Sequence, residues 1–208
     1  LFVEQAGLRA VIHQELGRKS FEDMRWEEIW DVALRIRSAF LASPIPPALA
    51  QAVAAAVEKV GASTPLAVRS SSLLEDSQLL PFAGLYRTYI LPNRARSRKT
   101  RLAQLLDAVR LVYASVFYRS PQEYVNNTNY RIEEEKMAVV VQQVVGRQHE
   151  QVLYPDMAGV ARSHDYYPME GMVPEDGVAS VVLGHGAAVV DGGRAVRFSP
   201  AHPRNLYQ

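Results

Sequence analysis

The 208-residue sequence contains no cysteine, and no apolar run in it approaches the roughly 20 residues that span a bilayer. The missing thiols exclude disulfides, thiolate metal sites and cysteine nucleophiles. The N-terminal residues also lack the charged and apolar regions of a signal peptide. We therefore expect a cytoplasmic protein that does not contact a membrane.

An excess of one charge sign is missing as well. Lysine and arginine total 23 against 22 aspartate and glutamate residues, for a formal net charge of +1. This balance argues against nucleic acid as the main partner, because nucleic-acid-binding domains usually present a strongly basic face. The 48% of hydrophobic residues is typical of a globular protein, and the length suits one domain or two small subdomains. The chain begins at Leu1 and ends at Gln208 without a terminating feature, so we expect it to be a piece of a longer protein.

Residues 1–62 are predicted to form a helical N-terminal part. A helix is expected over 26–41, and prolines end it. A second helix is expected to begin near Pro46 or Pro47 and to stop at Gly61, and residues 8–12 resemble the end of an earlier one. The apolar stripe of the 26–41 helix comprises Trp26, Ile29, Trp30, Ala33, Leu34, Phe40 and Leu41.

Strands enter in residues 63–136 and dominate residues 137–208. In the middle part we expect a strand over 66–69, a polar turn over 70–72, a strand over 85–91 and a long helix after the basic run 94–101. Residues 137–145 are β-branched and apolar, which predicts a strand buried on both faces. The fold class is therefore predicted to be α+β with a mostly antiparallel second half. Shorter strands are expected at 151–154, 159–162, 178–183 and 195–198.

The segment with the clearest chemistry follows the first predicted strand. Arg69 ends that strand and three serines come after it, so a guanidinium and several hydroxyl donors are available to phosphate oxygens. Glu75 and Asp76 close the segment and could hold Mg²⁺ or orient the loop. Serine-rich turns beside an arginine are common, so the spacing alone leaves a purely structural turn open.

Several segments together resemble the nucleotide-binding domain of phosphoenolpyruvate synthase and pyruvate phosphate dikinase. The resemblance covers the chain from about Leu66 to Phe198 and follows the order of the family's segments. The matching segments are Ala67–Ser71, Glu75–Asp76, Phe82–Gly84, Ala114–Phe117, Met137–Gln142, Gly159–Val160 and Leu183–Val190.

This resemblance implies an ATP-grasp-like fold in which N-terminal helices precede mixed, mostly antiparallel sheet subdomains that clamp ATP. The family transfers the β-phosphate of ATP, with Mg²⁺, to a histidine on a separate swivelling domain, and a barrel domain passes it on to pyruvate. The 208 residues contain neither of those domains, so by themselves they are expected to turn over nothing. The large relatives of the family make a homodimer an expected assembly.

The resemblance also assigns roles to residues. Arg69 is the expected catalytic residue, because it would contact the ATP phosphates. Gln142 to Val145 would border the adenine ring, where a strand edge can read the ring nitrogens. The full set expected to bind ATP is Arg69, Ser70, Ser71, Glu75, Asp76, Gln142, Gln143, Val145 and Arg162.

Two departures from the family pattern concern acidic residues. Arg87 stands where the family has a glutamate in the strand after Gly84, and His185 stands where an acidic residue is expected to bind the metal. Neither side chain supplies the hard oxygen that Mg²⁺ prefers. The alternative is therefore a degenerate, non-catalytic module for nucleotide binding or regulation. The enzyme interpretation holds if carboxylates elsewhere compensate, and the candidates are Asp165, Asp176 and Asp191.

Other polar residues have simpler interpretations. His164 beside Asp165 could form a metal or acid–base pair, but a surface hydrogen bond is the expected role. His185 lies in the glycine turn of the nucleotide domain rather than in a phosphohistidine motif. The triplet at residues 133–135 is expected to be a solvated acidic turn.

Overall fold

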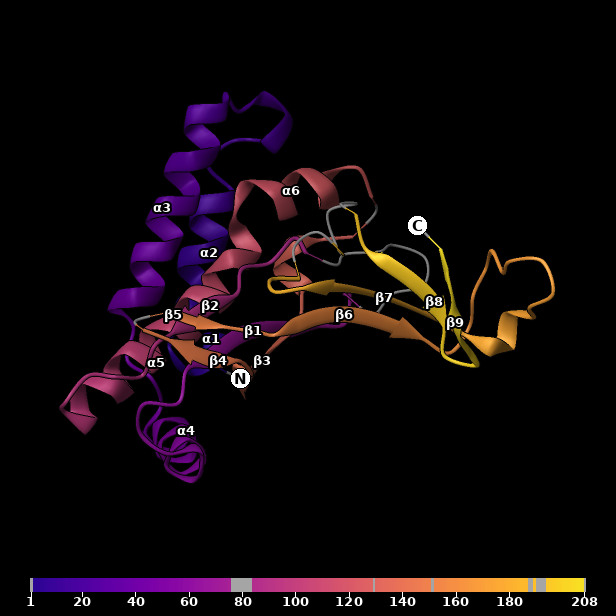
Figure 1. Ribbon diagram of the computed structural model, residues 1–208. Helices are drawn as coiled ribbons and strands as arrows, with labels where there is room; N and C mark the ends of the chain where they lie inside the picture. The colour runs from indigo at the N-terminus through magenta and orange to yellow at the C-terminus, as the bar shows by residue number, and fades with distance from the viewer. Residues whose placement is uncertain are drawn as a thin grey trace. The chain divides into compact units, whose positions relative to one another are not determined.

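The computed structural model describes residues 2–75, 84–128, 130–150, 152–186, 189 and 194–207 (Figure 1). Its chain divides into two compact units, Leu1–Val144 and Val145–Gln208, here called the first and the second unit. Helices and a small sheet make up the first unit, and antiparallel strands dominate the second. The predicted α+β class is confirmed.

The N-terminal helices of the first unit are α1 (Phe2–Gln5), α2 (Leu8–Leu16), α3 (Trp26–Ala42) and α4 (Pro47–Val60), with a 3-10 turn at Phe21–Asp23. The carboxylate of Glu28 accepts a hydrogen bond from the Arg25 N–H at 2.7 Å and so satisfies one of the unpaired donors where α3 begins. Helix α4 begins at a proline and ends at Gly61, whose φ of +86° suits only glycine. Both helices therefore begin and end near the predicted positions.

The buried face of α3 differs from the predicted stripe. The side chains of Trp26, Trp30 and Leu34 are about half exposed, at 59%, 50% and 48%. The apolar residues of α3 cover more of its surface than the face that packs inward. Trp26, Trp30 and Leu34 lie at the edge of that apolar surface, so their spacing alone did not show that they are exposed. The side chains that pack inward are Ile29, Val32, Ala33, Ile36 and Phe40.

The later helices of the first unit are α5 (Arg98–Ala114) and α6 (Arg119–Asn126), with 3-10 turns at Ser115–Phe117 and Ile132–Glu134. The hydroxyl of Ser97 accepts a hydrogen bond from the Thr100 N–H where α5 begins. No single helix in the described ranges is long and apolar enough to cross a membrane, and only α3 and α4 together, bent by 83°, meet that test of length and composition.

A three-stranded antiparallel sheet lies beside α5, in the order β2 (Tyr89–Leu91), β1 (Leu66–Ser72) and β3 (Met137–Gln143). Strand β1 continues through the three serines, so the predicted turn at 70–72 is wrong. All seven residues of β1 pair with β3, and this ladder keeps the serines extended. Strand β2 is shorter than the predicted 85–91.

Strand β3 is buried on one face only, contrary to the prediction. Met137, Val139 and Val141 pack against the core, whereas Ala138 and Val140 are exposed. Helix α5 contacts all three strands and covers one side of the sheet. The β-branched composition therefore reflects strand propensity rather than burial on both sides.

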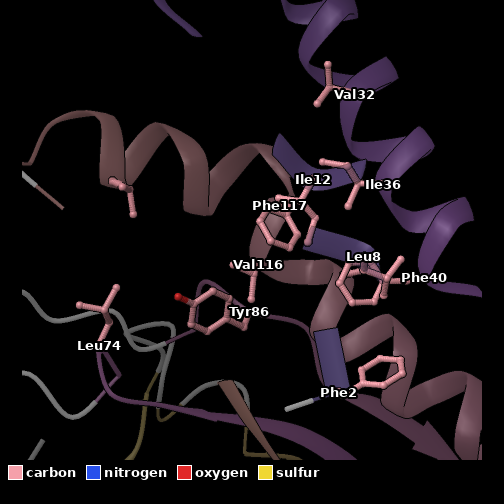
Figure 2. Close-up of a cluster of buried hydrophobic side chains, with 12 residues drawn as sticks. Phe2, Leu8, Ile12, Val32, Ile36, Phe40, Leu74, Tyr86, Val116 and Phe117 are labelled. Atoms are coloured by element: carbon pink, nitrogen blue, oxygen red, sulfur yellow. The ribbon is translucent and has the colours of Figure 1, made fainter. Parts of the chain in front are cut away.

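Two hydrophobic clusters hold the first unit together. The larger one joins α1, α2 and α3 to the end of α5 (Figure 2). In it the ring of Phe2 lies 6.1 Å from that of Phe40, and the ring of Tyr113 packs against the Phe2 ring at 5.2 Å. The smaller one lies between the sheet and α5. Its buried members are Leu66, Val68, Leu105, Ala108, Val109 and Val112.

The second unit contains the hairpin of β4 (Arg147–His149) and β5 (Val152–Tyr154) and a four-stranded antiparallel sheet. That sheet has the order β6 (Met157–Arg162), β7 (Val178–Leu183), β8 (Val196–Ser199) and β9 (His202–Tyr207). Four of these strands were predicted within a few residues. Strands β4 and β9 were not, because both are polar and lack the alternation of a half-buried strand.

Candidate functional site

The exposed face of the three-stranded sheet brings together three of the predicted residues. Side chains alternate along a strand, so Arg69 and Ser71 lie on the side of β1 that faces away from α5. Arg69 pairs with Val140 across the ladder, and Gln142 of β3 pairs with Ala67. Gln142 is therefore a diagonal neighbour of Arg69 on the same face. We call this surface the open face; its exposed residues are Arg69, Ser71, Ile90, Ala138, Val140 and Gln142, and Ala67, on the same side, is buried at 7% exposure.

Firm packing beneath the open face supports Arg69. Leu66 and Val68, which alternate with the outward residues, are 1% and 0% exposed against α5. A cationic group and a hydroxyl thus project from a strand whose other side is fully packed. Such a strand presents its donors with little freedom of the backbone.

Ser70 and Glu75 lie on the opposite side of β1 from Arg69. The Ser70 hydroxyl donates to one carboxylate oxygen of Glu75 at 2.8 Å, and the Ser72 N–H donates to the other at 2.9 Å. In return the Glu75 N–H donates to the Ser72 hydroxyl at 3.2 Å. Glu75 thus closes the end of β1, and the structure does not bring it or Ser70 to the open face. Its predicted neighbour Asp76 lies outside the described residues.

Glu135 is a polar residue of this region that sequence reasoning missed. Both of its carboxylate oxygens are shielded from solvent, so the prediction of a solvated acidic turn is wrong for this residue. Burial raises the pKa of Glu135 and the negative charge of Glu75 raises it further, whereas the nearby Ser72 and Tyr86 hydroxyls and the Lys136 N–H act against the rise. Nothing in the sequence distinguishes Glu135 from the two glutamates before it.

The same region borders a cavity of the first unit with a volume of about 930 Å³. Its walls come from α1, α2, the end of α5 and the segment that leads into β3. The three glutamates at 133–135 line it on one side, and apolar side chains such as Phe2 and Phe117 line it on the other. Ala138 of the open face lines this cavity, whereas Arg69, Ser71 and Gln142 do not, so the donors of the open face lie outside it.

The remaining predicted residues are dispersed. Gln143 ends β3 opposite Leu66 and is exposed, and Val145, at 82% exposure, lies beyond the strand. Arg162 ends β6 and lines a cavity of about 480 Å³ within the second unit. His185 is exposed in the turn after β7, with its ring 6.5 Å from that of Tyr154.

A magnesium site is not formed by the described residues. No group of three or more histidine, aspartate or glutamate side chains in the described ranges could hold a metal ion. Asp165 accepts hydrogen bonds from Arg197 and from the Tyr167 N–H, and Asp176 accepts one from the Val173 N–H, so both proposed substitutes for the missing carboxylates already have structural contacts. Asp191 lies outside the described residues.

Comparisons with known proteins match most of this chain. A family model described as "Pyruvate phosphate dikinase, AMP/ATP-binding domain" matches residues 1–204. A phosphoenolpyruvate synthase of Aeropyrum pernix is 30% identical over 158 residues, which cover 74% of this chain and 18% of that protein. A rifampicin phosphotransferase of Streptomyces sviceus is 30% identical over 158 residues, which cover 76% of this chain and 16% of that protein. The chain therefore spans less than a fifth of the length of these curated relatives.

Proposed function

The chain belongs to the family of pyruvate phosphate dikinase AMP/ATP-binding domains, and on this premise we propose that its open face binds ATP for phosphoryl transfer. The observation that carries the proposal is the exposed trio of Arg69, Ser71 and Gln142 on one face of a packed sheet. These are three of the residues that the family resemblance assigns to nucleotide binding, and they come from two strands that lie about 70 residues apart in sequence.

Arg69 is the residue we expect to matter most. Its planar guanidinium can donate two parallel hydrogen bonds to phosphate oxygens. Ser71, two residues along the same face, adds a hydroxyl donor. In phosphoryl transfer such fixed donors orient the phosphate chain and stabilise the charge on its oxygens as it develops.

The adenine end is proposed to lie along β3. This strand is at the edge of the described sheet, so the backbone N–H and C=O groups on its outer side are available to read a purine edge. Val140 offers an apolar surface for the ring, and Gln142 an amide that can both donate and accept. Gln143 and Val145 would border the same ring.

The wider reaction is proposed for the longer protein. There the β-phosphoryl group of Mg-ATP would pass to a ring nitrogen of a histidine on a separate swivelling domain, with AMP as the leaving group and the γ-phosphate transferred to water as inorganic phosphate. The phosphohistidine would then pass its phosphoryl group to the enol oxygen of pyruvate bound by a barrel domain and regain a free ring nitrogen. One relative is named a phosphoenolpyruvate synthase and another a rifampicin phosphotransferase, so the final acceptor differs between relatives of this domain. The 208 residues alone are expected to bind ATP without turnover.

Titration calorimetry of ATP into the chain, with and without Mg²⁺, tests the proposal. We expect the Arg69→Ala variant to bind ATP about tenfold to a hundredfold more weakly, since one charged hydrogen-bonding group is worth about 1.5–3 kcal/mol. Arg69→Lys keeps the charge but loses the paired geometry and should recover only part of the affinity. Arg96→Ala is the matched control, because Arg96 is exposed in the same unit and lies outside the open face. Equal losses in Arg69→Ala and Arg96→Ala would refute the proposed role of Arg69.

A non-catalytic module is the second candidate, and the residues at two family positions favour it. Arg87 is exposed, and its backbone N–H donates a hydrogen bond to the Ser115 hydroxyl at 3.2 Å. His185 is likewise exposed. If the chain binds ATP equally well with and without Mg²⁺, the module interpretation is favoured over the phosphotransferase. Stronger binding in the presence of Mg²⁺ would favour catalysis.

A further inference from the structure

The second unit contains a basic cavity that is formed by one face of its four-stranded sheet. The ladders place Val160, Ser180 and Arg197 in one row across β6, β7 and β8, and Arg162 pairs with Val178 in a neighbouring row. These residues all line the cavity of about 480 Å³, a volume within the usual range for small-molecule sites. The opposite face of the sheet is apolar, with Ala179 buried and paired with Phe198.

A buried carboxylate holds one of the two arginines. Asp165 is 3% exposed, and one of its oxygens accepts hydrogen bonds from the Arg197 guanidinium at 2.7 Å and from the Tyr167 N–H at 3.1 Å. Its own N–H donates to the Pro174 carbonyl at 2.8 Å, which ties the start of the β6–β7 loop to its end. A buried ion pair contributes little to stability after desolvation is counted, so fixing the direction of Arg197 is the better explanation for it.

The lining chemistry favours an anion. Arg162, Arg197 and the Ser180 hydroxyl supply donors, and His164 and two tyrosines form the rim. Asp165 is the only acidic residue among the described lining residues, and Arg197 neutralises it. The excess positive charge therefore comes from Arg162, which is exposed at the end of β6. Two guanidinium groups and a hydroxyl in one recess suit the tetrahedral oxygens of a phosphate group.

We propose that this cavity of the second unit binds a phosphate group of a small phosphorylated ligand, with Arg162 and Arg197 as its donors and Asp165 as the residue that positions Arg197. The phosphate could belong to the nucleotide of the proposed function or to a separate ligand. If the phosphate belongs to the nucleotide, this inference rests on the proposed function. If it belongs to a separate ligand, the inference is independent of that function.

The test is a titration of the isotopically labelled 208-residue chain with inorganic phosphate and, in a second series, with ATP, followed by amide NMR signals. We expect saturable shifts at Arg162, Ser180 and Arg197. Arg162→Ala should weaken phosphate binding about tenfold or more. Arg204→Ala, an exposed arginine of β9 that does not line the cavity, is the matched control for general charge.

A second variant guards against misfolding. Removing Arg197 alone would take away the guanidinium that pairs with the buried Asp165 carboxylate, so the two residues are replaced together as Asp165→Asn with Arg197→Gln. This double variant should keep the dispersed amide spectrum of the folded sheet and lose phosphate binding. If it folds and binds phosphate as the original chain does, the proposed role of the pair is wrong.

The outcomes separate this inference from the proposed function. ATP shifts in the second unit that vanish in Arg69→Ala identify the nucleotide as the source of the phosphate, and shifts that persist there identify a separate ligand. Phosphate shifts in the second unit together with no ATP binding would overturn the proposed function and leave this inference standing. The inference fails if phosphate does not shift these signals, if acetate shifts them equally, or if Arg204→Ala weakens binding as much as Arg162→Ala.

Discussion

The Glu75 carboxylate is predicted to be the main stabiliser of the end of β1. It accepts two hydrogen bonds, from the Ser70 hydroxyl and the Ser72 N–H, at 2.8 and 2.9 Å. Hydrogen bonds to a charged acceptor are worth about 1.5–3 kcal/mol each, and Ser70 at 5% exposure cannot regain its bond from water. Because Glu75 is only partly buried, we expect Glu75→Ala to lower the free energy of unfolding by about 2–4 kcal/mol, less than the sum of two full bonds.

Urea denaturation followed by circular dichroism measures this loss. With a slope of about 2 kcal/mol per molar urea, the midpoint of the first unit's transition should fall by roughly 1–2 M. Glu123→Ala is the matched control, since this exposed glutamate of α6 pairs with Arg119 at i,i+4 and should cost only about 0.3–0.5 kcal/mol. Equal midpoints for the two variants would refute the assigned role of Glu75.

A double-mutant cycle tests the specific partner of Glu75. If Ser70 and Glu75 act through their mutual hydrogen bond, the double variant Ser70→Ala with Glu75→Ala should cost about 1–2 kcal/mol less than the sum of the single variants. Additive costs would mean that the two residues stabilise the strand end independently. The same variants should weaken ATP binding only modestly, because neither side chain is on the open face.

Two further predictions concern pH and a glycine turn. The pKa of Glu135 is raised in the folded protein, so the folded state holds the proton more tightly than the unfolded chain does. Stability should therefore fall as pH rises from the ordinary glutamate pKa of about 4.3 through the raised pKa. Glu135→Gln should flatten this slope in urea titrations at pH 4 to 7, and an unchanged slope would contradict the assignment. Gly177 has a φ of +70°, and a Cβ there would lie 2.6 Å from the Arg162 carbonyl oxygen. Gly171 has a similar φ of +82°, but a Cβ there would meet nothing within 4 Å. We therefore expect Gly177→Ala to have a melting temperature well below that of Gly171→Ala. Equal melting temperatures for the two variants would show that backbone strain alone, and not the contact, sets the cost.

Local signals in the sequence were sufficient for most helices and for several strands. Helices α3 and α4 begin and end near the predicted residues because prolines and Gly61 mark their boundaries. The serines after Arg69 were misinterpreted as a turn, because their local preference for turns gave way to the ladder with β3. That ladder joins segments some 70 residues apart, which no local pattern can register.

The candidate site divides in the same way. The order of motifs identified the nucleotide-binding family and singled out Arg69, because a family signature survives as residue types in sequence. Which neighbours share a face with Arg69 depends on strand register, so Ser71 and Gln142 were brought to the open face while Ser70 and Glu75 were turned to the other side. Burial is likewise a property of the packed chain, so the buried carboxylate of Glu135 had no signature in its acidic triplet.

By itself the sequence determined the α+β class, the positions of the capped helices and the membership of an AMP/ATP-binding family, because composition, periodicity and motifs are local properties. Only the tertiary structure decided which side of each element is buried, which serine shares the open face with Arg69, and that Arg162, Asp165 and Arg197 line one cavity. Those outcomes depend on contacts between distant segments, whose free energies are set by packing and desolvation rather than by the residues next to them in the chain.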